Sequence, residues 1–372
     1  MSIRLSICIT VYNQIELIRD NLNNILRYKG NDIEIILQDD CSTEDIESLV
    51  ENYSDSRIKY YRNNKNLGHD RNIIEAFKNC SGKFAFLLRS SDTILEQGIT
   101  KILKFIDKNL EIGYCRFSCL SEKGTIRLLY QDNISNKGLD SVELHKKILI
   151  HPSGELYNLG YFSKSDWMCY EEYLNNYFDN NSKFVVHLLM RYKLVLEAGI
   201  ATSSDIVWKY SYTVKRKDVA ENRSKDRLCV YHPKLQYQRY RCELSYVVEQ
   251  LEGDGKNILI YDIIDRYEWL ITFMFYYFNK DRDMQKHYNY DRIPFSSLKE
   301  LSHFKQKTLS FSKHYNIQYN ELITKKVATM SSFQLVKWKF ERIFSKMNGI
   351  INAIINRLWR IKIYKGGKAK PT

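Results

Sequence analysis

KFAFLLRSSDTIL, residues 83–95, is an apolar run that stops abruptly at polar residues. The apolar part spans Phe84 to Leu88, and the polar part begins at Arg89. This pattern predicts a buried strand that ends in a polar loop. Three similar units precede it, each followed by a helical pattern: SICITVYN, IEIILQDDCSTED and IKYYRNNKN. Alternating strands and helices of this length predict an α/β fold with a mainly parallel, doubly wound, Rossmann-like sheet.

Acidic residues follow two of the predicted strands. Asp39 and Asp40 end one strand, and Asp92 ends another. Ligands of doubly wound sheets bind at the carboxyl ends of the strands, where carboxylates can accept ribose hydroxyls. A carboxylate in a second loop can hold a divalent cation that bridges phosphates. A single Asp in such a place more often caps a helix, but the set at successive strand ends predicts a nucleotide diphosphate site.

The composition limits the class of protein. The chain has 372 residues, of which 44% are hydrophobic, enough for two or three domains. No apolar run approaches the roughly 20 residues that cross a bilayer. The first strand begins close to Met1, which leaves no room for a signal peptide and predicts a cytoplasmic protein. Eight cysteines without a CxxC pair are expected to be reduced thiols.

The net charge of +13 suits several kinds of anionic partner. Nucleic acid, anionic lipid and phosphorylated substrates all fit a basic surface, and the charge does not choose among them. We expect no nucleic-acid partner, because no nucleic-acid-binding module is recognisable.

Residues 5–95 resemble the nucleotide-binding half of the inverting family 2 glycosyltransferases, which have the GT-A fold. The matching segments are LSICITVYNQIELI, IILQDDCSTED, NNKNLGHDRNIIEA and SGKFAFLLRSSD. The run from Asn66 to Ile73, followed by Ser-Gly-Lys-Phe, resembles the abequosyltransferase-like branch, which builds bacterial surface polysaccharides.

The resemblance implies a role for several residues at the strand ends. Asp92 would be the last residue of a motif that binds Mn²⁺ or Mg²⁺, and Arg71 would lie near the nucleotide. The residues implied for the base and ribose are Thr10, Val11, Tyr12, Asp39 and Asp40.

The acidic loop departs from the pattern of this branch. Relatives usually carry Gly-Asp-Asp-Asp where this chain has Arg89-Ser90-Ser91-Asp92. One carboxylate can still ligate a hydrated Mg²⁺ or Mn²⁺. Arg89 can also pair with phosphate in place of the cation, and we count Arg89 and Ser91 among the donor-binding residues. The alternative is a catalytically impaired relative that binds a sugar nucleotide or acts as a scaffold.

The acceptor half of the GT-A domain is expected at residues 111–243, after a nucleotide-binding half at 1–110. An inverting transfer needs a base for the proton of the acceptor hydroxyl. Glu155, in a predicted polar loop where burial would raise its pKa, is our first choice for this base. Asp166 is the second choice. The other candidates are His151, Glu171, Glu172 and Asp205.

The C-terminal part is predicted to be helical over 244–330 and basic and amphipathic over 331–372. The last segment combines Lys and Arg with interfacial Trp residues, as helices on membrane surfaces do. Binding to the anionic inner face of the cell membrane and packing on the catalytic domain are equally favoured.

Lys215, Arg216 and Lys217 could close over a diphosphate. The expected partners are a nucleotide-sugar donor and a lipid-linked or oligosaccharide acceptor of capsule or O-antigen synthesis.

Overall fold

The structure is a computed structural model that describes residues 2–178, 184–211 and 233–267. Predictions for Lys215 to Lys217, for residues 268–330 and for the basic segment 331–372 lie outside these ranges. None of the described helices is long and apolar enough to cross a membrane.

Four parallel strands form the first half of the sheet, as the sequence predicts. They lie in the order β3-β2-β1-β4, with β1 between β2 and β4. The winding therefore reverses between β1 and β4, which creates a switch point for ligand binding. The strands are β1 (Leu5–Val11), β2 (Ile33–Asp39), β3 (Ile58–Arg62) and β4 (Phe84–Arg89).

The second half continues the same sheet with mixed strand directions. β9 (Glu155–Asn158) lies antiparallel between β4 and β6 (Tyr114–Leu120), and β10 (Ile200–Lys209) is parallel to β6. The expected division at residue 110 thus falls within one continuous sheet. The short strands β5 (Thr93–Ile94), β7 (Ile126–Leu128) and β8 (Asn133–Ser135) pair with β10, β6 and β10.

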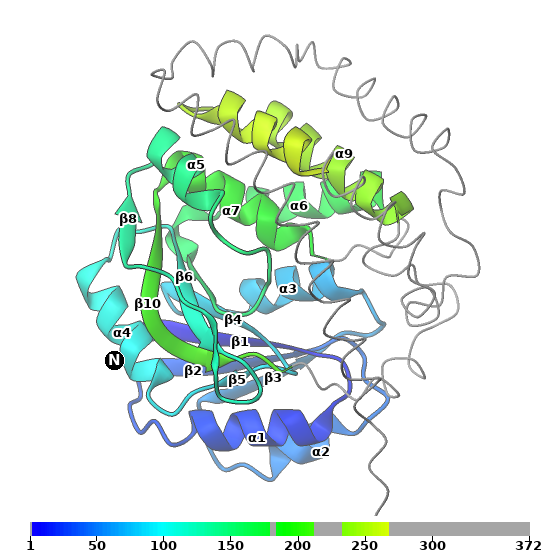
Figure 1. Ribbon diagram of the computed structural model, residues 1–372. Coiled ribbons are helices and arrows are strands. Elements are labelled where there is room, and N and C mark those ends of the chain that lie inside the picture. Colours follow the sequence, from blue (N-terminus) through cyan, green and yellow to red (C-terminus); the bar gives the residue numbers. More distant parts are fainter. Residues whose placement is uncertain (1, 179–183, 212–232, 268–372) are drawn as a thin grey trace, which may run out of the picture. The chain divides into compact units, whose positions relative to one another are not determined.

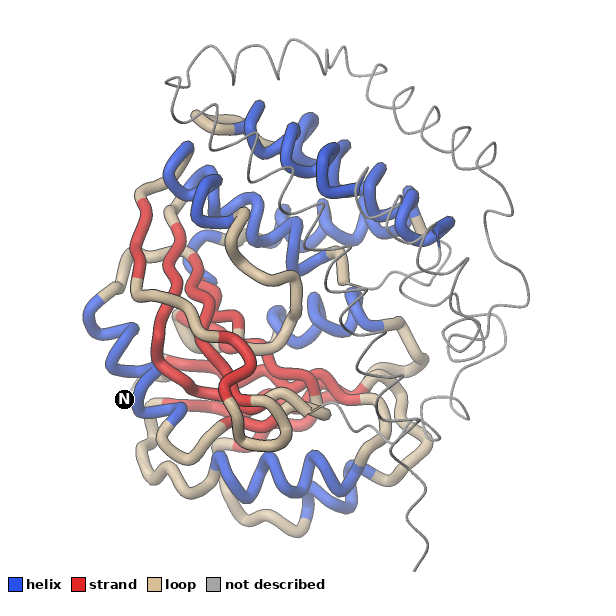
Figure 2. The backbone as a smooth tube through the Cα atoms, viewed as in Figure 1, coloured by secondary structure: helices blue, strands red, loops and turns tan. Residues whose placement is uncertain are grey.

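Helices cover both faces of the sheet (Figures 1 and 2). One face carries α1 (Ile15–Ile25), α2 (Ile46–Glu51) and α4 (Gly98–Lys108), whose apolar residues share a core cluster with the strands. The other face carries α3 (His69–Lys78) and α7 (Val186–Glu197), which pack against further helices. These are α5 (Leu139–His145), α6 (Lys164–Tyr177) and α9 (Pro233–Gln250), and the expected boundary at 243/244 lies inside α9.

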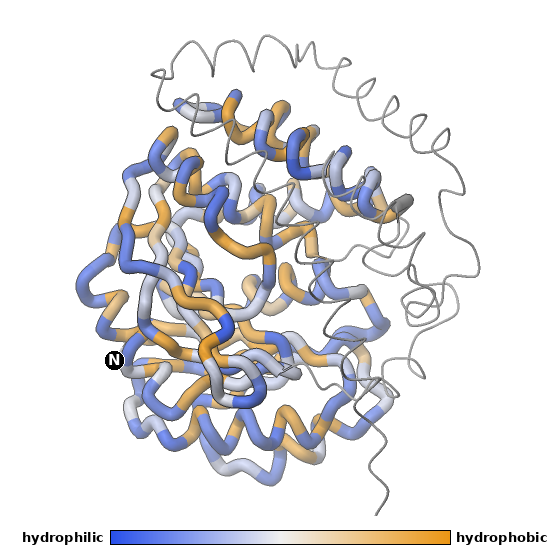
Figure 3. The backbone as a smooth tube through the Cα atoms, in the orientation of Figure 1, coloured by the Kyte–Doolittle hydropathy of each residue, from blue (hydrophilic) through white to orange (hydrophobic). Residues whose placement is uncertain are grey.

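Strand β1 is buried along its whole length, as a strand covered on both faces must be. Leu5, Ile7 and Ile9 belong to the core cluster on the α1 side. Helix α1 buries Ile18, Leu22 and Ile25 together with the polar Asn21, and its apolar and polar residues alternate in orange and blue in Figure 3.

The loops after β1 and β2 are tied together by side chains at the starts of two helices. Oδ1 of Asn13, after β1, accepts the backbone N–H groups of Thr43 and Glu44, after β2. In return, Oε2 of Glu44 accepts the N–H of Ile15 at 2.7 Å, at the start of α1. Helix α2 is capped by Asp45.

Gly154, just before β9, allows the side chain of Trp208 to lie directly against the backbone. Its φ is +82°, and a Cβ at this position would lie 2.1 Å from Nε1 of Trp208. The left-handed conformation costs other residues roughly 1–2 kcal/mol, and overpacking adds about 1–3 kcal/mol.

We expect Gly154→Ala to lower the free energy of unfolding by roughly the sum of these costs, about 2–5 kcal/mol. Gly124→Ala is the matched control, because Gly124 has φ +77° and open space around it. In urea unfolding, Gly124→Ala should lose only the roughly 1–2 kcal/mol that the left-handed backbone conformation costs. Equal losses in the two variants would contradict the packing argument at Trp208.

Buried histidines predict loss of stability in mild acid. Burial lowers the pKa of His145 and of His187 well below the usual range, and the charge of Arg191 adds to this effect. The unfolded chain titrates these groups near pH 6.5, so below that pH it binds protons that the folded chain does not. Stability should therefore fall as the pH drops from 6.5 to 5, by about 1.4 kcal/mol per pH unit for each histidine.

Urea unfolding at pH 7.5, 6.5 and 5.5 measures this slope. His145→Phe keeps a ring beside Tyr192, which His145 contacts at 5.3 Å between centroids. In this variant the free energy of unfolding should fall less steeply with decreasing pH, by about 1.4 kcal/mol per pH unit, because one proton fewer is bound on unfolding. An unchanged slope would show that His145 does not contribute.

Candidate functional site

The carboxyl ends of β1, β2 and β4 lie at one edge of the sheet, which we call the carboxyl edge. β6 and β10 also end there, because both run parallel to β4 through the antiparallel strand β9. The residues after each of these strands are polar or aromatic. The topology therefore gathers side chains from distant parts of the sequence around the β1–β4 switch point.

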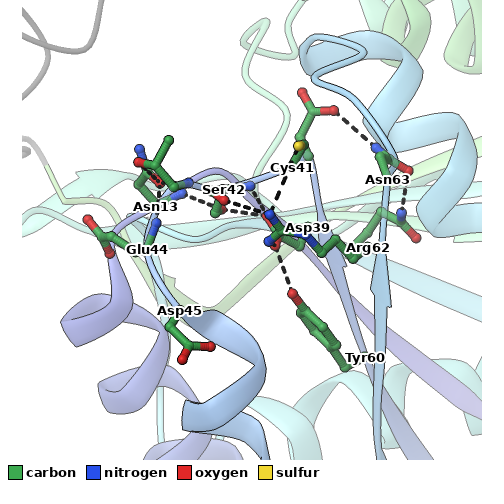
Figure 4. A network of polar contacts seen from close by, with 12 residues as sticks. Asn13, Asp39, Cys41, Ser42, Glu44, Asp45, Tyr60, Arg62 and Asn63 are labelled. Carbon is green, nitrogen blue, oxygen red and sulfur yellow. Dashed lines mark hydrogen bonds and ion pairs between the residues drawn. The ribbon is translucent and has the colours of Figure 1, made fainter.

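Asp39, at the end of β2, is fully buried, and its carboxylate is hydrogen-bonded to neighbouring residues of the chain. Its carboxylate accepts four hydrogen bonds, from the backbone N–H and Oγ of Ser42, the hydroxyl of Tyr60 and Nη1 of Arg62. Figure 4 shows Tyr60 and Arg62 reaching this carboxylate. Four bonds use all the lone-pair positions of a carboxylate. Asp39 therefore holds the loop after β2 to β3, and its contact with a donor stays a prediction.

Asp40 organises the entry into helix α3. Its Oδ1 accepts from the N–H of Leu67 at 2.6 Å and from Nδ2 of Asn63 at 3.0 Å. Its Oδ2 accepts from the N–H of Gly68 at 2.8 Å. One lone-pair position of this carboxylate is left over. Asp40 is thus able to accept one hydroxyl group at the carboxyl edge without giving up a bond.

Asp92, after β4, is surrounded by donors. Its Oδ2 accepts from Nε of Arg89 at 3.0 Å and from Oγ of Ser153 at 2.6 Å. Its Oδ1 accepts from the N–H of Ser211 at 3.0 Å. The side chain of Asp92 is fully buried, whereas that of Arg89 is 24% exposed. The negative charge of Asp92 is therefore balanced inside the chain, and Arg89 is the part of the pair that a ligand can reach.

These contacts do not fit a divalent cation at Asp92. A Mg²⁺ or Mn²⁺ site needs free carboxylate oxygens, and a positive charge beside them repels the cation and lowers its affinity. Here Nη2 of Arg89 lies 3.0 Å from Oδ2 of Asp92, and Ser90 and Ser91 stand where further carboxylates would help. Within residues 2–178, 184–211 and 233–267, no three His, Cys, Asp or Glu side chains are grouped to hold a metal ion.

The other predicted donor-binding residues lie at or near the same edge. Thr10 and Val11 end β1, and their carbonyl groups accept the N–H groups of Ser90 and Asp40. Tyr12 follows them and is half-buried. Ser91 is buried in the loop after β4.

Arg71 lies in the first turn of α3 and donates from Nη2 to Oδ1 of Asn175 in α6. It therefore joins two helices, and a contact with a nucleotide stays a prediction.

Glu155 does not lie in a polar loop, because it begins strand β9. It is fully buried between two guanidinium groups, with Nη1 of Arg191 at 3.3 Å and Nη1 of Arg116 at 3.7 Å from its Oε1. The hydroxyl groups of Tyr114 and Tyr157 donate to it at 2.9 and 2.6 Å. Burial raises the pKa of Glu155, and the two arginines oppose this shift.

Asp166 lies in the first turn of helix α6, where it forms a capping box with the N-cap residue Ser163. Its Oδ2 accepts from the N–H and the Oγ of Ser163, and its Oδ1 lies 3.2 Å from Nζ of Lys193. The contacts of Glu155 and Asp166 favour structural roles for both. Their assignment as the catalytic base stays a prediction that this geometry does not support.

Of the alternative bases, Glu171 pairs with Lys78, and Asp205 lies 3.6 Å from Lys101. His151 lies at the carboxyl edge, where its Nδ1 accepts from the N–H of Ser153.

Ser153 and Ser211 complete the site but carry no signal in the sequence. Each is a common polar residue in a loop, and Ser211 lies 119 positions from its partner Asp92. Only the strand order, with β9 beside β4 and β10 beside β6, brings them to the carboxyl edge.

Comparisons with known proteins agree with this fold. Residues 6–165 match the family described as Glycosyl transferase family 2. The abequosyltransferase RfbV of Salmonella typhimurium is 29% identical over 116 residues, which cover 30% of this chain and 35% of that protein. A Campylobacter jejuni GalNAc(5)-diNAcBac-PP-undecaprenol beta-1,3-glucosyltransferase is 30% identical over 171 residues, covering 44% and 52%.

The chain thus spans about a third to a half of the length of these relatives. Among solved structures, S. aureus TarS 1-349 in complex with UDP-GlcNAc aligns with a TM-score of 0.58 and 17% identity, over 84% of this chain and 81% of that one. This likeness shows an α/β fold of the GT-A type. The family match and the polar switch point between β1 and β4 lead to one conclusion: residues 6–165 of this chain form an α/β domain that is similar to glycosyl transferase family 2.

Proposed function

We propose that this chain is an inverting glycosyltransferase, which moves a sugar from a nucleotide-sugar donor to an acceptor in the synthesis of a bacterial surface glycan. The observation that carries the proposal is the convergence of polar residues after β1, β2 and β4 at the switch point of a family 2 domain. Nucleotides bind at this place in doubly wound sheets.

The relatives support the substrate classes of the proposal. One similar structure holds UDP-GlcNAc, which supports a nucleotide-sugar donor. One similar enzyme is named for a polyprenyl-diphosphate glycan, and another is an abequosyltransferase. We therefore propose a lipid-linked or oligosaccharide acceptor of capsule, O-antigen or a related glycan, and work at the cytoplasmic face of the membrane.

In this proposal the nucleotide lies against the ends of β1 and β2. Tyr12, with Thr10 and Val11, lines the base pocket, and the free lone pair of Asp40 accepts a ribose hydroxyl. Asp39 supports the pocket by holding the loop after β2 to Tyr60 and Arg62. A carboxylate or His must take the proton of the acceptor hydroxyl.

A second function is favoured by the Arg89–Asp92 pair. An acidic loop whose carboxylate is already neutralised is what a catalytically impaired relative would contain. Such a protein would bind a sugar nucleotide, or act as a scaffold, without transferring the sugar.

Incubation with UDP-, CDP-, dTDP- and GDP-sugars tests the proposal, with release of free nucleotide and thermal shift as the two readouts. We expect one donor to stabilise the chain and to release its nucleotide. A thermal shift without release, also in the presence of candidate glycan acceptors, would favour the non-catalytic relative. No response to any donor would contradict both functions.

Tyr12→Ala should weaken binding of that donor by about tenfold, because base–aromatic stacking contributes roughly 1–3 kcal/mol. Tyr161→Ala is the control. Tyr161 follows β9 at the opposite edge of the sheet, where Leu159 bonds to Lys83 at the start of β4. Equal affinities of the two variants in calorimetry would remove Tyr12 from the base pocket.

The basic segment 331–372 gives a separate prediction about the membrane. Each Lys or Arg near an anionic surface adds on the order of 1 kcal/mol of attraction. Deletion of this segment should abolish cosedimentation with vesicles that contain anionic lipid, whereas donor binding should persist. Unchanged cosedimentation would favour packing of the segment on the rest of the chain.

A further inference from the structure

Two guanidinium groups meet on the ring of Tyr210, which follows β10 at the carboxyl edge. The guanidinium carbon of Arg89 lies 5.8 Å from the ring centroid, and that of Arg127 lies 3.7 Å from it. Arg89 comes from the end of β4 and Arg127 from β7. The N–H of Tyr210 donates to the carbonyl group of Leu120, so the ends of β6 and β10 bring the ring between these arginines.

The charge of this group is not balanced by carboxylates. Arg89 is paired with Asp92, but no carboxylate of the described residues forms an ion pair with the exposed Arg127. Two positive charges and one negative charge therefore lie together, and cations on one aromatic ring repel each other. An anionic ligand would relieve this repulsion.

His151 adds a neutral ring to the same place. Its ring centroid lies 5.2 Å from that of Tyr210 and 5.5 Å from that of Trp208. Burial and the charges of Arg89, Arg116 and Arg127 hold the pKa of His151 well below its usual range.

Because Nδ1 of this neutral ring accepts the N–H of Ser153, its proton is on Nε2, a buried atom without a hydrogen-bond partner. The ring thus has one N–H donor to offer. Together, Arg89, Arg127, His151 and Tyr210 form what we call the Tyr210 cluster.

We infer that the Tyr210 cluster binds the diphosphate of the donor through Arg89 and Arg127, without a divalent cation. The inference rests on the proposed function, because it names how the donor site holds its phosphates. A guanidinium group pairs with phosphate oxygens through two parallel hydrogen bonds. Arg89 stands in the loop where relatives carry further carboxylates, and it neutralises Asp92, which a cation would need.

The cluster also stands in the right place for a diphosphate. Arg89 is the last residue of β4, and the loops of Tyr12 and Asp40 follow the neighbouring strands β1 and β2. A nucleotide whose base lies by Tyr12 would therefore direct its phosphates across the switch point toward Arg89. Leaving-group charge that develops on the diphosphate during transfer would be stabilised there by fixed positive charges.

Calorimetry with the full chain tests the inference, with UDP, CDP, dTDP and GDP as probes. Each nucleotide is titrated in EDTA and again with Mn²⁺ or Mg²⁺. We expect one nucleotide to bind with the same affinity, within about twofold, in all three buffers. Arg127→Ala should weaken its binding by about ten- to a hundredfold, as expected for a lost charge-assisted hydrogen bond.

Arg127 is the first variant because it is exposed and has no carboxylate partner among the described residues. Arg27→Ala is its control for loss of one positive charge. Arg27 follows α1 and pairs with Glu96 at 3.3 Å, on an exposed surface. The Arg27→Ala variant should bind the nucleotide with the same affinity as the original chain.

Arg89→Ala leaves the carboxylate of Asp92 buried without a positive partner, so this variant can lose binding because it fails to fold. A double variant is therefore used to separate folding from binding. Arg89→Gly combined with Ser91→Asp restores two carboxylates to the loop. We expect this variant to bind the nucleotide weakly in EDTA and more tightly with Mn²⁺.

The outcomes distinguish the inference from the proposed function. Binding that requires a cation in the original chain would overturn the inference and leave the glycosyltransferase proposal intact. So would binding that is equally tight in the Arg127→Ala and Arg27→Ala variants. Absence of binding to every nucleotide in all buffers would overturn the proposed function itself.

Discussion

Two adjacent carboxylates at the end of β2 determine the shape of the carboxyl edge. Asp39 and Asp40 are almost completely buried, so every bond they lack would cost free energy. Asp39 fixes the loop after β2 to Tyr60 and Arg62 of β3. Asp40 fixes the segment that begins α3 through Leu67 and Gly68. Loops that would otherwise move independently are thereby held in one arrangement around the switch point, which is the preorganisation that ligand binding requires.

The end of β4 is governed by charge rather than by shape. A buried carboxylate must be paired, because the cost of an isolated charge away from water is high. In this chain the partner of Asp92 is Arg89, three residues earlier on the same loop. The same pairing makes the site positive, since Arg127 joins Arg89 on Tyr210. The end of β4 thus presents positive charge at the carboxyl edge rather than a free carboxylate.

Local patterns predicted the first half of the fold and did less well for the second. Strands β1, β2, β3 and β4 were predicted within a few residues, because each is an apolar run closed by polar residues. The strand that begins at Glu155 was predicted to be a loop, because a charged residue after a glycine usually indicates an exposed turn. Its charge is tolerated inside only because Arg116, Arg191 and two tyrosine hydroxyls come from elsewhere in the chain.

The same reason limits what could be predicted about the site. The acidic residues after the strands were found from the sequence, because their position relative to each strand is a local property. Their partners were not, because Ser153, Arg127 and Tyr210 reach the carboxyl edge through strand order alone. The base is the least predictable part: a buried Glu155 and a helix-capping Asp166 both look like free carboxylates in a sequence.

The antiparallel strand β9 has a consequence for the order in which the site can form during synthesis. Strands β1 to β4 can pair with one another as soon as residue 89 has left the ribosome, whereas β9, the other partner of β4, follows later. Asp92 must wait for Ser153, 61 residues later, and for Ser211, 119 residues later. Since nascent chains grow by only about 5–20 residues per second, the loop spends several seconds with a partly solvated carboxylate. The half of the sheet that contains β1 to β4 can therefore pair first, although its loop at Asp92 acquires its last partners much later.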